Sequence, residues 1–174
     1  MKTAGLNPAM PPSGPTPMTP TKAWPSPGAW PEDFKLMSGT WVQTGSLRVQ
    51  TIAALSPLAE DALITGHDRA YVGLLVWPSR AGLRSVAPDA AEETLLSDPR
   101  VLAAAKAKLS AYNADATGSS ARIGRMMFMA EPPSIDAGEI TDKRYINQRT
   151  SLDRRADLVE KLYAEPPGKD VIVA

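Results

Sequence analysis

Apolar runs alternate with polar breaks along residues 32–164, and this alternation predicts short strands interleaved with helices. The unbroken apolar run 71–77 predicts a central strand, because a strand buried on both faces has few polar positions, and Pro78 ends it. Ser38 and Gly39 indicate a tight turn in which glycine takes a positive φ. Four further strands are predicted, at 34–37, 40–42, 62–65 and 125–130.

Three segments have helical periodicity. Ser46 is the expected cap of a helix over 46–55, with Val49, Ile52 and Ala53 facing inward. A second helix begins at Pro99 after a Ser97 or Asp98 cap, and its apolar stripe is Leu102, Ala105, Leu109 and Tyr112. A third spans 147–163 with a buried stripe of Leu152, Ala156, Val159 and Tyr163. The resulting order predicts a small α+β domain, with helices packed on a short sheet.

Composition separates the two ends of the chain from this domain. Residues 1–31 hold nine of the 17 prolines and no acidic residue. Because proline fixes φ and lacks an amide donor, we expect a disordered Pro-rich tail at 1–31, before a domain over 32–164. Residues 165–174 are expected to form a C-terminal tail.

Charge and rare residues exclude several function classes. Lys plus Arg and Asp plus Glu both number 19 in the 174 residues, so broad attraction to nucleic acid or to an anionic membrane is not favoured. The absence of cysteine excludes disulfides, thiolate nucleophiles and zinc ribbons, and a single histidine argues against a metal site. No apolar run reaches the length of a membrane span, and we expect a soluble cytoplasmic protein.

Two polar segments carry candidate chemistry. His67 stands beside Asp68 in a predicted turn over 66–69, and without a nucleophile to serve it is best interpreted as an exposed turn histidine. Lys143 lies in a polar loop between a strand and a helix, where its ammonium could reach an anionic substrate. Taken alone, such a loop is more often an ordinary charged connector.

Five segments in the same order carry a family resemblance. They read FKLMSGTWV at 34–42, GHDR at 66–69, AEPPS at 130–134, GEITDK at 138–143 and YINQR at 145–149. Over 32–164 the chain resembles the small C-terminal domain of feruloyl-CoA synthases, a family of AMP-forming acid–CoA ligases. Such enzymes adenylate a carboxylic acid with ATP and Mg²⁺, then transfer the acyl group to coenzyme A, and the small domain rotates between the two steps.

The resemblance implies roles for particular residues. It implies that Lys143 is catalytic and approaches the acyl carboxylate and the α-phosphate during adenylation. It also implies that the turn of Ser38, Gly39, Thr40 and Trp41 faces the pantetheine arm of coenzyme A. The wider superfamily places its lysine directly after the glycine of this loop, where this chain has Glu139. Arg144 stands where feruloyl-CoA synthases are expected to have glycine.

Other parts expected of the complete enzyme are missing from this sequence. The hinge Gly-Arg, the phosphate-binding loop and the magnesium-binding glutamate motif do not occur in it. We therefore expect no ligase activity and no tightly bound cofactor from this chain alone, and no metal site. The expected partner is an N-terminal adenylation domain, and the expected substrate is an aromatic carboxylic acid. Two other hypotheses are a non-catalytic binding module that retains the fold, and an adaptor that acts through the Pro-rich tail.

Overall fold

The computed structural model describes residues 32–174, so the expected Pro-rich tail at 1–31 lies outside the described residues. The strands are β1 (Phe34–Lys35), β2 (Trp41–Val42), β3 (Ala59–Thr65), β4 (Val72–Pro78), β5 (Ile123–Phe128) and β6 (Val171–Val173). The helices are α1 (Thr44–Leu55), α2 (Arg80–Val86), α3 (Pro99–Asp115), α4 (Gln148–Arg154) and α5 (Ala156–Tyr163), with a 3₁₀ turn at Leu95–Ser97. None of these helices is both long and apolar enough to cross a bilayer.

The main sheet has four strands in the order β3-β4-β5-β6, and β1 pairs with β2 in a separate hairpin. The strand β4 is antiparallel to β3 and parallel to β5, and β6 returns antiparallel to β5. The connection from β4 to its parallel neighbour β5 contains α2 and α3, as such a crossover requires. The predicted central strand is therefore confirmed, and every residue of β4 except Pro78 is buried.

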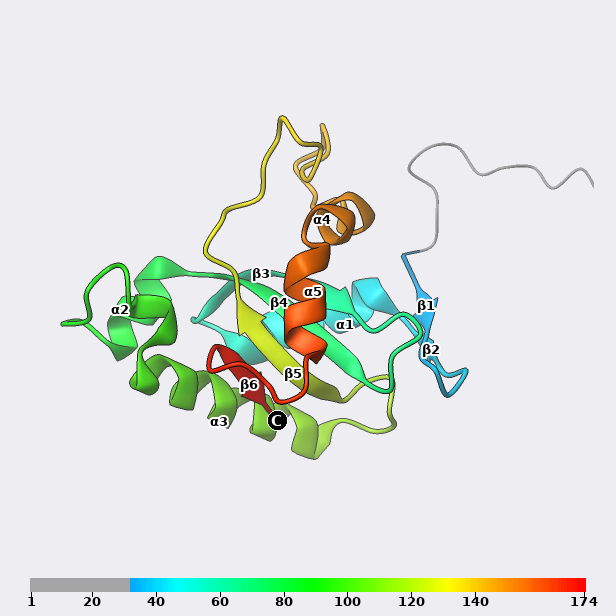
Figure 1. Cartoon of the computed structure of the whole chain (residues 1–174), viewed down its shortest axis with the longest axis horizontal. Helices are drawn as coiled ribbons and strands as arrows, with labels where there is room; N and C mark the ends of the chain where they lie inside the picture. Colours follow the sequence, from blue (N-terminus) through cyan, green and yellow to red (C-terminus); the bar gives the residue numbers. More distant parts are fainter. Residues whose placement is uncertain (1–31) are drawn as a thin grey trace, which may run out of the picture. The chain divides into compact units, whose positions relative to one another are not determined.

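Helices cover both faces of this sheet (Figure 1). One core contains side chains of α1 and α3 together with Leu74 and Val76 of β4. The other core contains Leu75 and Trp77 of β4 with Leu162 of α5. Because successive strand residues point to opposite faces, a strand between two cores must be apolar throughout, which explains the unbroken run 71–77. The predicted α+β class is confirmed.

The helix α3 agrees with the sequence in its start and its face. Asp98 is the cap, and its side chain accepts a hydrogen bond from the amide of Arg100. Val101, Ala105 and Leu109 are buried, and Leu102 and Tyr112 pack at the margin of the same core. The short helix α2 was not predicted, because seven residues between a strand and a polar connector give too little periodicity to detect.

The predicted inward face of α1 is confirmed for Ile52, which packs at the margin of the first core, but is wrong for Val49 and Ala53. The helix begins at Thr44, not at Ser46, and Val49 is 69 % exposed. Ala53 is exposed as well. The side chains that α1 buries are Thr44, Leu47, Thr51 and Leu55. The helix starts early because residues before it hold Thr44 in place. The Thr44 amide donates to Asp33 Oδ1 at 2.9 Å, and the Thr44 hydroxyl donates to the carbonyl of Glu32 at 2.8 Å.

The single helix predicted over 147–163 is two helices, α4 and α5, which meet at Arg155. Arg155 has φ −105° and ψ 25°, outside helical values, and it is 4 % exposed. The break turns α5 so that Leu162 is buried and Ala156 is exposed. Of the predicted stripe only Ala156 is displaced, whereas Leu152, Val159 and Tyr163 are half-buried and pack at the margin of the second core.

Residues at the C-terminal end belong to the sheet. We expected the domain to end at 164, but β6 pairs with β5 through Met126↔Ile172 and Met127↔Val171. Val171 and Ile172 are buried. Three apolar residues at the end of a chain are too short a run to be identified as a strand from sequence.

Candidate functional site

The first candidate segment is the β1–β2 hairpin. The amide of Leu36 donates to the carbonyl of Thr40 at 2.9 Å, and the amide of Gly39 donates to the carbonyl of Leu36 at 2.8 Å. Gly39 has φ +82°, and a Cβ added there would meet nothing within 4 Å. The backbone conformation therefore requires glycine at this turn, whereas crowding within the chain does not.

Polar and aromatic groups surround this glycine at the surface. The hydroxyls of Ser38 and Thr40 lie 3.0 Å apart. The Trp41 side chain is 57 % exposed, and the Lys35 ammonium lies 4.9 Å from the centroid of its ring. Met37 is 71 % exposed. The hairpin therefore presents an accessible backbone flanked by an aromatic ring.

The 66–69 turn supports this hairpin from behind. The amide of Met37 donates to the carbonyl of Arg69 at 2.9 Å, and the amide of Asp68 donates to the carbonyl of Lys35 at 3.1 Å. His67 is exposed beside Asp68, with 3.2 Å between Nδ1 and Oδ2, as expected for a turn histidine. This turn therefore holds the hairpin against the sheet.

The second candidate segment is a small hairpin over residues 140–146, named here the lysine hairpin. Ile140 and Ile146 form a β-bridge, and the amide of Thr141 donates to the carbonyl of Tyr145 at 2.8 Å. The Arg144 amide donates to the Thr141 carbonyl at 2.8 Å. Three loop residues closed in this way form a turn whose last position is left-handed.

Arg144 occupies that left-handed position, with φ +62°. Glycine takes such a conformation without steric cost, whereas other L-residues are strained in it. The resemblance led us to expect glycine at this place, and the observed φ is one that glycine would take without strain. The turn forms here with arginine in place of the expected glycine.

Lys143 lies at the tip of the lysine hairpin and is exposed. Within residues 32–174 no hydrogen bond or ion pair engages its ammonium. A cation that is held on a closed turn and is not neutralised by its own chain is available to an external anion. The predicted catalytic residue is therefore placed where an incoming substrate could meet it.

Glu139, at the position where the superfamily pattern has lysine, is buried. Its carboxylate accepts hydrogen bonds from Arg155 Nε and from the amide of Ser134, both at 2.8 Å. Burial alone would raise the pKa of Glu139, but these hydrogen bonds outweigh it and hold the pKa below its ordinary value. Glu139 therefore remains an internal anion and is not presented to a ligand.

The YINQR segment that contributes to the resemblance is largely structural. Asn147 caps α4, because its side chain accepts a hydrogen bond from the amide of Thr150. Gln148 is 3 % exposed, and its side-chain amide bonds both the N–H and the carbonyl of Ile64 in β3. These two residues fix the start of α4 and thus the returning limb of the lysine hairpin.

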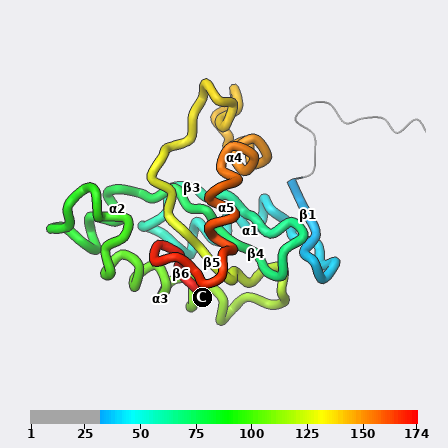
Figure 2. Tube along the Cα trace, viewed as in Figure 1, coloured from blue at the N-terminus to red at the C-terminus, as the bar shows by residue number. Residues whose placement is uncertain are grey.

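The two candidate segments come from different parts of the fold. The β1–β2 hairpin and the segment that leads up to α4 lie at different sides of the domain in the Cα trace (Figure 2).

Sequence reasoning did not single out Arg155, which is buried and pairs with the Glu139 carboxylate next to the lysine hairpin. A signal existed, because Arg155 lies three residues after Leu152 and four before Val159, on the side predicted to be apolar. A charged residue on such a face indicates a buried partner.

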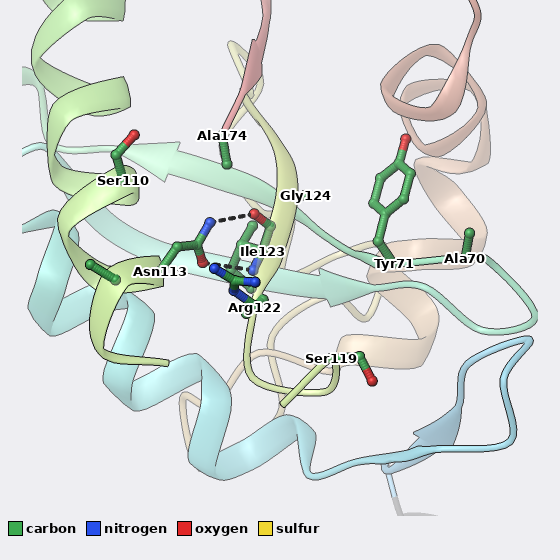
Figure 3. A pocket seen from close by; sticks show the side chains of 10 residues that line it. Ala70, Tyr71, Ser110, Asn113, Ser119, Arg122, Ile123, Gly124 and Ala174 are labelled. Atoms are coloured by element: carbon green, nitrogen blue, oxygen red, sulfur yellow. Dashed lines mark hydrogen bonds between the residues drawn. The ribbon is translucent and has the colours of Figure 1, made fainter. Parts of the chain in front are cut away.

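A surface depression beside α3 contains none of the predicted site residues. Asn113 is its central polar side chain, and its amide donates to the carbonyl of Ile123 and accepts from the amide of the same residue, at 2.8 and 2.9 Å (Figure 3). These bonds join α3 to β5 and occupy the amide group. In the described part of the chain, no three His, Asp or Glu residues are grouped to hold a metal ion.

Solved structures with a similar fold are adenylation domains. The A domain of a carboxylic acid reductase from Segniliparus rugosus, in complex with AMP and a co-purified carboxylic acid, matches with a TM-score of 0.60 and 20 % identity over 76 % of this chain and 20 % of that chain. The A-PCP didomain from the same organism, in complex with AMP, matches with a TM-score of 0.59 and 19 % identity, over 76 % and 17 %. The adenylation domain of a carboxylate reductase from Mycobacterium chelonae matches with a TM-score of 0.56 and 19 % identity, over 76 % of this chain and 19 % of that chain.

At this identity the likeness shows the fold, and the chain spans about a fifth of the length of those structures. No curated protein matches the sequence. The model of a family described as the AMP-binding enzyme C-terminal domain matches residues 36–166. Since this match includes the turn at Gly39, the lysine hairpin and most of the described residues, the chain belongs to the family of C-terminal domains of AMP-binding enzymes.

Proposed function

We propose that this chain is the C-terminal lid domain of an aryl- or hydroxycinnamoyl-CoA ligase and works in the cytoplasm with an N-terminal adenylation domain. In the first reaction, the acid displaces diphosphate from ATP to give acyl-AMP. In the second, the thiol of coenzyme A displaces AMP to give the acyl-CoA. The observation that carries the proposal is the exposed Lys143, which has no partner among the described residues and lies at the tip of a closed hairpin.

Lys143 acts in the first reaction through its charge. As the carboxylate attacks the α-phosphate, negative charge accumulates on the phosphoryl oxygens. A positive charge about 4 Å away is worth about 4 kcal/mol at an effective dielectric constant near 20. Because Lys143 is not neutralised by an internal carboxylate, this attraction is available to the transition state.

The β1–β2 hairpin acts in the second reaction. Gly39 has no side chain and an open surrounding, so the backbone can approach a thin substrate arm such as pantetheine. Ser38 and Thr40 offer hydroxyls, and Trp41 offers an exposed ring beside it. Since this hairpin and the segment that leads up to α4 lie at different sides of the domain, the proposal requires the domain to turn between the two reactions.

The described residues supply only part of the chemistry. They form no cluster of carboxylates suited to Mg²⁺, so no step of the mechanism is assigned to a metal on this chain. Binding of the nucleotide and of the aromatic acid is likewise assigned to the partner domain. The isolated chain should therefore have no ligase activity.

Reconstitution tests the proposal. The chain is mixed with the adenylation domain of a feruloyl-CoA synthase lacking its own C-terminal domain, then supplied with ferulate, ATP, Mg²⁺ and coenzyme A. Acyl-adenylate and acyl-CoA should form only when both proteins are present. Lys143→Ala should slow adenylation by about 10²–10³-fold, the range for loss of one transition-state donor.

Lys106 provides a matched control, because it is an exposed lysine on α3, far along the chain from the lysine hairpin. Lys106→Ala should leave both half-reactions unchanged. Turnover by the isolated chain, or full adenylation with Lys143→Ala, would contradict the proposal.

A binding module without catalysis is the second candidate, because the superfamily position of the lysine holds the buried Glu139. It predicts that the chain binds an adenylation domain while Lys143→Ala changes no rate. The adaptor hypothesis concerns residues 1–31, which lie outside the described residues.

A further inference from the structure

We propose that the buried Glu139–Arg155 ion pair is a positioning element that sets the place of Lys143. The inference rests on the proposed function, since positioning matters only if Lys143 meets a substrate. It adds two positioning residues, neither of which touches the reacting atoms.

The pair is far more buried than charged residues ordinarily are. Glu139 has no exposed surface, and the Arg155 side chain is 3 % exposed. Arg155 Nε lies 2.8 Å from Glu139 Oε1, and Nη2 lies 3.2 Å from Oε2. Removing two charges from water costs free energy that the pair recovers only with good geometry and additional hydrogen bonds. An ion pair that is buried at this cost next to an exposed hairpin is therefore expected to have a role in the structure of that hairpin.

The pair ties together both limbs of the segment that carries Lys143. On the incoming limb, the Ser134 amide donates to Glu139 Oε2 at 2.8 Å, and Arg155 Nη2 donates to the carbonyl of Pro132 at 3.1 Å. Beyond the returning limb, Arg155 at the end of α4 reaches back to the Glu139 carboxylate, and the Asn147 amide donates to the backbone carbonyl of Glu139 at 2.8 Å. Glu139 directly precedes the lysine hairpin, so these bonds fix its base.

The other end of the pair is anchored to the central strand. The Arg155 guanidinium lies 5.2 Å from the centroid of the Trp77 ring, and Trp77 belongs to β4. Trp77 Nε1 donates to the carbonyl of Glu131 at 3.0 Å, which holds the start of the same segment. A continuous series of contacts therefore runs from the sheet to the base of the lysine hairpin.

A different result is expected if the pair only stabilises the domain as a whole. In that case its removal lowers the stability of the whole domain, and the hairpin follows only when the domain unfolds. A positioning pair instead controls local opening of the hairpin while the sheet stays closed. Amide hydrogen exchange separates the two, because it measures opening residue by residue.

The test replaces both charges with apolar side chains of similar volume, Glu139→Leu with Arg155→Met, in the full chain. Such a replacement of a buried ion pair is commonly neutral for global stability, so the domain should still fold. It removes the bonds to Ser134 and Pro132. The Thr141 and Asn147 amides donate to backbone carbonyls that the substitutions leave in place, so faster exchange there reports opening of the hairpin itself. Loss of the charged hydrogen bonds at its base should speed that opening at least about tenfold. Amides of β4 should be unchanged.

A matched control removes another bidentate pair, Arg48 with Asp61, which joins α1 to β3. Arg48→Met with Asp61→Leu should leave exchange in the lysine hairpin unchanged. If the Glu139/Arg155 double variant does not fold, Glu139→Gln serves in its place, because it keeps the shape and one acceptor. Unchanged exchange at Thr141 and Asn147 in the folded variant would overturn the inference.

The reconstituted ligase gives the second readout. A displacement of about 1 Å can cost about 10²-fold in rate, so the double variant should lower kcat of adenylation by that order with little change in KM. Arg155→Lys keeps one charged hydrogen bond and should recover part of the rate. If the unaltered chain yields no acyl-adenylate, the proposed function fails, and hydrogen exchange alone decides whether the pair holds the hairpin.

Discussion

Replacement of Gly39 by alanine isolates the cost of backbone conformation at the tip of the β1–β2 hairpin. Gly39 has φ +82°, and an added Cβ would have no heavy atom within 4 Å. The substitution therefore introduces strain without a steric clash. The hydrogen bond from its amide to the carbonyl of Leu36 uses no side-chain atom and is available to alanine as well.

The magnitude follows from the left-handed conformation. For an L-residue this conformation costs about 1–2 kcal/mol. A change of 1 kcal/mol shifts Tm by about 2–4 °C in a chain of this size. Gly39→Ala should therefore lower Tm by about 2–8 °C. The comparison is Gly45→Ala, which also adds a Cβ to open space but lies in α1, where alanine is favoured by about 0.5–1 kcal/mol.

Thermal unfolding of the two variants, followed by circular dichroism, is the assay. Tm should fall for Gly39→Ala and rise for Gly45→Ala, so the opposite signs exclude a general effect of the added methyl group. An unchanged or higher Tm for Gly39→Ala would refute the reasoning. In the reconstituted ligase, Gly39→Ala should slow acyl transfer to coenzyme A and leave adenylation unaltered, because only the second reaction is assigned to this hairpin.

Three further predictions concern single positions. Arg144→Gly relieves a left-handed φ of +62° and should raise the unfolding free energy by about 1 kcal/mol in denaturant titration. Gly82→Ala places a Cβ 1.8 Å from the Pro57 carbonyl and should lower that free energy by about 1–3 kcal/mol or more. The depressed pKa of Glu139 contributes stability that is full above about pH 4.5 and is lost as pH falls through the lower folded value. Glu139→Gln should flatten this acid dependence, and an unchanged pH profile would contradict it.

Elements that depend on local pattern could be predicted from the sequence. The strand β4 is identifiable because it lies between two cores, and α3 because Asp98 and Pro99 mark its start. The turn at Gly39 follows from glycine alone. In each case the residues that determine the structure lie within the element itself.

Elements that depend on distant partners could not be predicted in full. The start of α1 is fixed by Glu32 and Asp33, so its buried face differs from the one that Ser46 would give. The break at Arg155 depends on Glu139, sixteen residues earlier in the chain. For the candidate site, the resemblance to a known family predicted a role for Lys143. The burial of Glu139 and its ion pair with Arg155 became visible only in the structure.

The side chain of Gln148 has a consequence for how copies of this protein behave toward one another. Strand β3 is one of the two outer strands of the sheet, and Gln148 occupies both the N–H and the carbonyl of Ile64 on it. An uncovered outer strand can recruit a strand from another molecule and begin aggregation. By imitating a neighbouring peptide group, one glutamine blocks that recruitment at the apolar stretch around Ile64, and so helps to keep the sheet at four strands.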